Sequence, residues 1–214
     1  MAELFSSYSS EFFEGFKFTL YASFLALIFS LLIGTLMAIL QLSHNSVIRN
    51  LAKAYVAFFR NIPLLIIVMF FYVVAPMYFY SFDGFQAGTI GLTIYTSAFI
   101  AETVRSGIQT VPKGQMEAGL SSGFSYAETM RYIVLPQAFK IVVPPLGNQF
   151  INLIKNSSIL AMVAGLDLMY QGDLIASTTF NTFGTYIIVG LFYLILTLPL
   201  SYLMNYLDKH WASV

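Results

Sequence analysis

The feature that most restricts this chain is an apolar stretch from about Phe16 to Leu42, which holds no charged residue after Lys17. A helix over this stretch is long enough to cross the hydrocarbon core of a bilayer, roughly 30 Å, even when it is tilted. Hydrophobic residues make up 58% of the chain and charged residues 9%, and the mean hydropathy is +0.77. Soluble domains carry about 25% charged residues. The sequence therefore predicts an integral membrane protein.

Composition and motifs also exclude several classes of function. The formal net charge is zero, which disfavours nucleic acid as a partner because its phosphates require a basic surface. The chain has no Cys, and so no disulfide or thiolate metal site. It carries neither a GxxxxGK[ST] phosphate loop nor an HExxH or GxSxG motif. We therefore expect no catalytic residue, no metal site and no bound cofactor. The acidic N-terminus also predicts no cleavable signal peptide.

The fold class expected is an all-α membrane protein with one domain over residues 1–214. Five helices are predicted to cross the membrane, at about residues 16–42, 62–80, 88–108, 137–155 and 185–207. Pro63 fits the first turn of the second span, and Pro144 with Pro145 is expected to break the fourth. Residues 156–183 are predicted to form a re-entrant or surface helix and a loop.

Three local patterns refine this outline. Residues 43–61 carry Arg49, Lys53 and Arg60 on an otherwise apolar helix, which predicts an amphipathic helix on the membrane surface. Gly34 and Ala38 form a small-xxx-small pair, typical either of a close helix contact or of lipid-facing filler; the sequence leaves both open. Glu102 and Arg105 are expected to pair at i,i+3 where their helix leaves the membrane.

The basic residues predict the orientation. Eight of the ten Lys and Arg residues lie on one predicted side: Arg49, Lys53, Arg60, Arg105, Lys113, Arg131, Lys140 and Lys209. The excess of Lys and Arg marks the cytoplasmic face. The N-terminus is therefore expected outside and the C-terminus in the cytoplasm.

One long polar segment, at about residues 113–136, interrupts the apolar chain. Its sequence predicts a helix that ends near Ser122, a turn at Gly123 and a second helix capped by Ser125 with Glu128 as its capping-box partner. The orientation places this helix-turn-helix on the cytoplasmic face.

The same segment resembles the EAA loop of ABC importer permeases. Glu117-Ala118-Gly119, Gly123, Ile133 and Leu135-Pro136 match the pattern EAA-x3-G-x9-I-x-LP, except that Gly119 replaces the second alanine. Four further blocks resemble the polar amino-acid branch of that family: FFRNIPLL, AFIAETVRSGIQTVPKGQ, LPQAF and PLGNQFINLIKNSSIL.

The resemblance implies a permease subunit of the bacterial cytoplasmic membrane that moves polar amino acids, either glutamine- and glutamate-like or basic. It implies a second permease subunit, identical or homologous, two cytosolic ATPase subunits that bind ATP and Mg, and an extracytoplasmic amino-acid-binding protein. Residues expected to contact the ATPase are Gln115, Glu117, Ala118, Gly119, Ser122, Gly123, Tyr126 and Arg131. Since the family has alanine at its position, Gly119→Ala is expected to be tolerated.

Polar residues inside predicted spans suggest the substrate path, because such residues are costly in a bilayer and usually face a pathway. The candidates are Thr96, Ser97, Asn148, Gln149, Asn152, Lys155, Asn156, Ser157 and Ser158. The helix is expected to break after Lys155, so that Ser157 or Ser158 caps a half-helix whose N-terminus binds the substrate carboxylate.

Alternatives remain open from the residues alone. The polar stripe fits a structural seam that joins helices, and Lys155 fits a side chain that snorkels to the interface. The chain as a whole also fits a secondary transporter or channel without an ATPase, or a membrane scaffold. The helix-turn-helix disfavours a transporter without an ATPase, since such a protein needs no docking element of this kind.

The orientation is testable by cysteine labelling, because the chain has no native Cys. We expect Ser81→Cys and Ser177→Cys to react with a membrane-impermeant reagent in intact cells. Ser46→Cys and Ser122→Cys are expected to react only after permeabilisation. Labelling of Ser122→Cys from outside would contradict both the orientation and the role of the polar segment.

Overall fold

The computed structural model describes residues 1–211, which form helices and short connections without a strand. The order is α1 (Ala2–Ser7), α2 (Ser9–Gln41), α3 (Ser46–Asn61), α4 (Leu64–Met69), α5 (Ala75–Tyr78), α6 (Gly84–Thr110), α7 (Lys113–Ser121), α8 (Tyr126–Thr129), α9 (Leu135–Asn156), α10 (Leu168–Thr179) and α11 (Thr182–Trp211). Two π-helical segments, η1 (Phe70–Val74) and η2 (Met130–Val134), and a 3₁₀ segment, η3 (Ser157–Val163), connect some of them. The predicted all-α class is thus confirmed.

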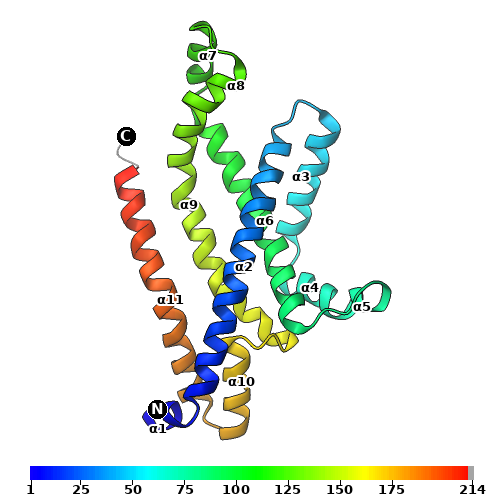
Figure 1. Cartoon of the computed structure of the whole chain (residues 1–214), viewed down its shortest axis with the longest axis vertical. Coiled ribbons are helices and arrows are strands. Elements are labelled where there is room, and N and C mark those ends of the chain that lie inside the picture. Colours follow the sequence, from blue (N-terminus) through cyan, green and yellow to red (C-terminus); the bar gives the residue numbers. More distant parts are fainter. Residues whose placement is uncertain (212–214) are drawn as a thin grey trace.

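The long helices run side by side, with the N-terminus at one end of the bundle and α7 and α8 at the other (Figure 1). Within the described residues, α2 and α11 are each long and apolar enough to cross a membrane. Two bent pairs also qualify if each counts as one span: α3 with Leu64–Tyr78, and Tyr126–Val163 with α10. Two to four spans are therefore supported, and a fifth crossing, by α6, stays a prediction.

The packing of α2 against α6 is the most extensive contact in the bundle. The buried face of α2 consists mainly of small residues, at Ala22, Ala26, Ser30, Gly34 and Ala38. Each is four residues from the next, so they lie on one face of the helix. A Cβ atom on Gly34 would lie 2.7 Å from Cγ2 of Ile100 and 2.8 Å from the carbonyl oxygen of Ser97. The Gly34–Ala38 pair is therefore a close helix contact.

The second predicted span, residues 62–80, begins at a sharp bend and consists of α4, η1 and α5 in direct succession. Ile62 has extended backbone angles, φ −100° and ψ 135°, directly before Pro63, and the chain turns by 104° there. Proline disfavours helical geometry in the residue before it, which explains the position of the break. The segment from α4 to α5 projects sideways from the bundle (Figure 1).

The amphipathic helix predicted over residues 43–61 is present as α3, but its predicted place on the membrane surface does not fit its packing. Helix α3 packs lengthwise against α2 and α6 rather than across the end of the bundle (Figure 1). Ala52 and Val56, one turn apart, form its buried face. Of the charged residues that suggested a surface helix, Arg60 reaches Glu102 of α6 at 3.8 Å, and Arg49 donates to the Ser43 carbonyl at 3.0 Å.

The fourth span does not break at Pro144 and Pro145, contrary to the sequence prediction. Both prolines lie inside α9, which runs without interruption from Leu135 to Asn156. Membrane helices tolerate proline where neighbouring helices hold the segment in place, and α9 packs between α6 and α11. The irregularity occurs elsewhere: η1 and η2 directly precede the helical turns that contain Pro76 and Pro136. A π-turn relieves the clash between a proline ring and the preceding turn.

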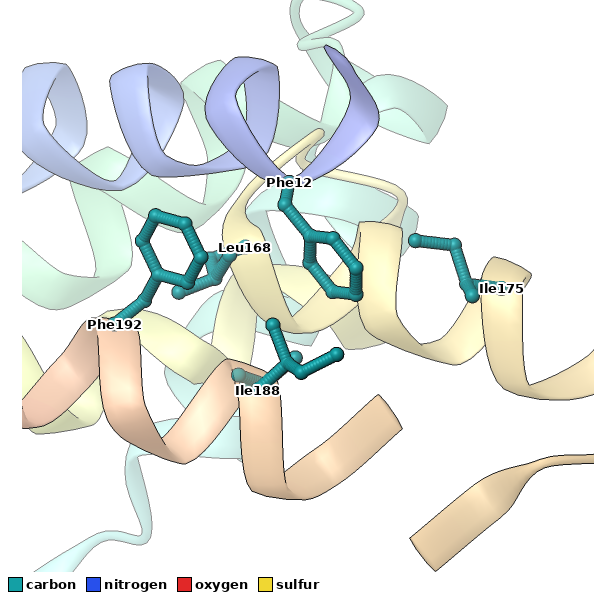
Figure 2. Packing of buried hydrophobic residues seen from close by; sticks show 6 residues of the cluster. Phe12, Leu168, Ile175, Ile188 and Phe192 are labelled. Carbon is teal, nitrogen blue, oxygen red and sulfur yellow. The ribbon is translucent and has the colours of Figure 1, made fainter. Parts of the chain in front are cut away.

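A separate apolar cluster joins the helices at the N-terminal end. Phe12 of α2, Leu168 and Ile175 of α10, and Ile188 and Phe192 of α11 point toward one another (Figure 2). The rings of Phe12 and Phe192 stack with their centroids 6.1 Å apart. Helix α10 is thereby held against the ends of two long helices.

The α2–α6 contact predicts which glycine tolerates a side chain. We expect Gly34→Ala to lower the melting temperature of the detergent-solubilised protein, since overpacking a tight contact costs about 1–3 kcal/mol. Gly190→Ala is the matched control, because nothing lies within 4 Å of a Cβ at that position. An equal or higher melting temperature for Gly34→Ala than for Gly190→Ala would contradict the close packing.

Candidate translocation path and coupling surface

The structure brings four of the predicted path residues together in one open cavity of about 150 Å³ between α6 and α9. Thr96, Gln149, Asn152 and Asn156 line it, with Tyr95, Phe99 and Leu153. The spacing of Gln149, Asn152 and Asn156 places them on one face of α9, and α6 supplies the opposite wall. We call this the polar cavity. Its hydroxyl and amide groups can donate and accept hydrogen bonds with a small polar molecule.

The other five predicted residues do not line this cavity. Ser97 is fully buried, and its hydroxyl donates to the carbonyl of Ile94 and lies 2.7 Å from that of Tyr55. Asn148 and Lys155 are exposed on a neighbouring face of α9. The hydroxyls of Ser157 and Ser158 donate to backbone carbonyls of the preceding turn. Ser97 and Ser157 are therefore packing residues, which fits the alternative of a structural seam between helices.

The break expected after Lys155 is wrong. Helix α9 passes directly into η3, and no side chain caps η3. Ser157 and Ser158 donate to the carbonyls three residues earlier, Ile154 and Lys155, at 2.7 and 2.9 Å. These bonds accompany the tighter 3₁₀ turn and leave no free helix N-terminus at this point. The polar sequence that suggested a cap instead marks a change of helix type.

The chain does break nearby, at residues 164–167. Ala164 and Leu166 adopt left-handed angles, with φ of 52° and 61°, and α10 then begins at a bend of 50°. Asp167 caps α10 by accepting hydrogen bonds from the backbone N–H groups of Met169 and Tyr170. The half-helix start is thus already occupied by a carboxylate from the chain itself.

A second cavity, of about 320 Å³, adjoins the polar cavity. It is lined by the charged residues Arg60 and Glu102, which were not among the predicted path residues. Arg60, Phe99, Glu102, Thr103, Ser106, Gly107, Thr110, Ile141, Pro145 and Gln149 line it. We call it the charged cavity. The predicted Glu102–Arg105 pair is confirmed, with Oε1 of Glu102 2.5 Å from Nη2 of Arg105. Arg60 joins from α3, 3.8 Å from Oε2 of Glu102.

The sequence offered only an indirect signal for Arg60. It lies in the FFRNIPLL block and Glu102 in the AFIAETVRSG block, but they are far apart in the chain. Only the packing of α3 along α6 brings them together.

The helix-turn-helix has the predicted geometry. Helix α7 ends at Ser121, Gly123 has φ of +88°, and Ser125 caps α8. The backbone N–H of Ser125 donates to Oε2 of Glu128 at 2.8 Å, and the N–H of Glu128 donates to Oγ of Ser125 at 3.3 Å. The Ser125 backbone and, second, its hydroxyl hold the pKa of the Glu128 carboxyl below its ordinary value.

This element protrudes from the end of the bundle (Figure 1). Of the eight residues predicted to contact the ATPase, all except Gly119 are exposed: Gln115, Glu117, Ala118, Ser122, Gly123, Tyr126 and Arg131. Leu120 and Phe124 add exposed apolar surface. The rings of His44 and Tyr126 lie 6.3 Å apart, which ties the α2–α3 connection to the same end. The surface therefore combines apolar and charged groups around one turn.

Comparison with known proteins identifies the class that this fold and surface define. Residues 30–213 match the model of the family described as "Binding-protein-dependent transport system inner membrane component". The chain therefore belongs to this family of permease subunits, which form the translocation component of ABC transporters while a separate subunit hydrolyses ATP.

Several relatives are similar over nearly their whole length. The chain is 57% identical over 206 residues to the "Probable glutamine ABC transporter permease protein GlnM" of Bacillus subtilis, covering 96% of this chain and 95% of the relative. It is 36% identical over 198 residues to the "Glutamine transport system permease protein GlnP" of Escherichia coli, covering 92% and 90%. A solved structure, "Crystal structure of an amino acid ABC transporter with histidines", matches with a TM-score of 0.90 at 36% identity over 96% of each chain.

The surroundings of Gly119 do not fit the expectation that alanine is tolerated at this position. Gly119 is buried at the base of α7, and a Cβ there would press on the side chain of Thr129 and lie 3.0 Å from Cδ1 of Ile133. Thr129 is fully buried and cannot swing away freely. The structure therefore opposes the expectation that Gly119→Ala is tolerated. Glycine at position 119 leaves room for the side chain of Thr129 on the facing helix.

This packing predicts a compensating pair. We expect Gly119→Ala to weaken the coupling surface, measured as reduced co-purification of the partner ATPase. Adding Thr129→Ala, which removes the methyl and hydroxyl groups that meet the new Cβ, is expected to restore it. Gly114→Ala serves as the control because nothing lies within 4 Å of its Cβ position. Unchanged co-purification in Gly119→Ala alone would show that alanine is tolerated at this position, as the family pattern implies.

Proposed function

We propose that the chain is the permease subunit of an importer for polar amino acids, with glutamine as the first candidate. The polar cavity carries this proposal: two amide side chains of α9, Gln149 and Asn152, face Thr96 of α6 across it. A zwitterion needs both donors and acceptors, and these groups supply both. The glutamine and amino-acid transporters named among full-length relatives support the same substrate class.

We propose that the chain crosses the membrane five times, with α6 as the third crossing and the N-terminus outside. The distribution of Lys and Arg supports this orientation. The opposite positions of the N-terminus and of α7 and α8 also support it (Figure 1). Residues 1–214 would then form one transmembrane domain in the bacterial cytoplasmic membrane.

Membership of the family implies an ATPase partner and pairing of permease subunits. We propose further that the ATPase is a cytosolic dimer that docks on the helix-turn-helix, and that an extracytoplasmic binding protein delivers the amino acid. The chain itself is proposed to hold no metal or cofactor, since ATP and Mg belong to the ATPase. A transporter without an ATPase is the rejected alternative, because the exposed helix-turn-helix would then have no partner.

Uptake by the reconstituted complex tests the path and the coupling separately. With L-glutamine, L-glutamate, L-arginine and L-histidine as substrates, we expect Asn152→Ala to lower uptake at limiting substrate several-fold. A lost hydrogen bond to a charged group costs about 1.5–3 kcal/mol. ATPase binding should stay intact. Gly123→Val, which forces a β-branched residue into left-handed geometry, is expected to uncouple ATP hydrolysis from uptake instead.

Asn50→Ala is the control for Asn152→Ala, since Asn50 is exposed on α3 and lies outside both cavities. Wild-type uptake kinetics in Asn152→Ala would place the path elsewhere. Wild-type coupling in Gly123→Val would argue against docking at the turn. Absence of uptake for all four amino acids by the unmodified complex would reject the substrate class.

A further inference from the structure

The polar cavity and the charged cavity adjoin each other. Phe99 and Gln149 line both of them, so these two side chains stand between the cavities. The residues beyond this junction differ in kind. The polar cavity offers neutral hydroxyl and amide groups, whereas Arg60 and Glu102 line the charged cavity.

The ion pairs of the charged cavity do not balance. Glu102 uses both oxygens on Arg105: Oε1 is 2.5 Å from Nη2, and Nε donates to Oε2 at 3.2 Å. Nη1 of Arg105 donates to Gln109 at 2.6 Å. Two guanidinium groups thus meet one carboxylate that Arg105 already satisfies, and one positive charge remains in excess. A purely structural pair would need no second arginine.

Arg60 holds the excess charge in an accessible position. Its nearest carboxylate oxygen is 3.8 Å away, beyond hydrogen-bond distance, and 40% of its side chain is exposed. Among the described residues, no hydrogen bond occupies its guanidinium group. The same group lies over the ring of Phe99, 5.4 Å from the centroid, and so at the junction of the two cavities. Its donors are free to bind an anion.

We propose that the charged cavity is a second substrate station, in which Arg60 binds the α-carboxylate of an amino acid that has passed Phe99. The inference rests on the proposed amino-acid substrate and adds a position and a recognition group to it. The planar guanidinium group matches the geometry of a carboxylate and can bind it through two hydrogen bonds.

Gln149 belongs to both stations and links them. Its amide can contact the amino acid in the polar cavity and again beside Arg60, because it lines each cavity. The substrate would therefore leave the neutral groups of the polar cavity for Arg60 while it keeps its contact with Gln149. Arg105 does not take part directly; it neutralises Glu102 and so leaves Arg60 available.

Protection of a single cysteine tests the station. Ser106 lines the charged cavity, is exposed and lies outside the ion-pair group. In the nucleotide-free complex of permease and ATPase, we expect L-glutamine to slow the reaction of Ser106→Cys with a charged methanethiosulfonate reagent. L-glutaminamide, which has a carboxamide in place of the α-carboxylate, is expected to give no protection. Ser177→Cys on α10 is the control cysteine, and its rate should not respond to either compound.

Substitution of Arg60 provides the second arm. In the Ser106→Cys background, Arg60→Gln is expected to raise the L-glutamine concentration for half-protection about tenfold or more, the size expected for a lost charged hydrogen bond. Arg60→Lys, which keeps the charge without the fork, should give a smaller increase. Arg49→Gln is the matched control, since Arg49 is at the far end of α3 and bonds to residues 43–46; it should leave protection unchanged.

The results separate this proposal from the proposed function. Uptake of L-glutamine by the unmodified complex without protection of Ser106→Cys would overturn the second station and leave the amino-acid importer intact. Equal protection by L-glutaminamide, or unchanged protection in Arg60→Gln, would also overturn it. If Arg60→Gln does not assemble with the ATPase, the comparison of L-glutamine with L-glutaminamide still decides the question, because it needs no change at Arg60.

Discussion

The close packing of α2 on α6 is the contact on which the rest of the structure depends. Small residues at Ala22, Ala26, Ser30, Gly34 and Ala38 let the two backbones approach. In a bilayer there is little hydrophobic force between helices, so packing and hydrogen bonds must hold them together. With α6 fixed against α2 on one side, its other sides receive α3 and α9. Both cavities lie on that part of α6, and Leu153 of the polar cavity packs against Ala26 of α2 and Leu92 of α6, so the geometry of the cavities depends on the α2–α6 contact.

Helix α6 also separates two kinds of polar residue that look alike in the sequence. Thr96 faces the polar cavity, whereas its neighbour Ser97 is buried and bonds to Tyr55 and to the Ile94 carbonyl. One residue along a helix rotates a side chain by about 100°, which is enough to move it from the path to the packing face. On α9, Asn152 lines the cavity, whereas Asn148, one turn before it, is exposed and lies outside the cavity. Some polar residues of the predicted spans thus line the cavity, whereas others lie in the packing between helices.

Helix ends and breaks show where local reasoning succeeds and where it fails. The turn at Gly123 and the Ser125–Glu128 capping box were predictable because both depend on residues within a few positions of one another. The break after Lys155 and the break at Pro144 were not, because a helix with such residues is either interrupted or continued according to its neighbours. Packing against α6 and α11 keeps α9 continuous, and the serine hydroxyls then bond back to carbonyls of their own helix.

By itself the sequence determined the membrane class, the helix-turn-helix, the Glu102–Arg105 pair and the family, because each depends on composition, on short spacing or on a contiguous motif. Tertiary structure decided which polar residues share a cavity, that Arg60 joins Glu102 from another helix, and that Gly119 faces Thr129 too closely to accept alanine. These features depend on distances between segments far apart in the chain. These distances depend on how closely the helices pack. Small residues on α2 allow close packing, but they do not by themselves specify which residues of other helices come into contact.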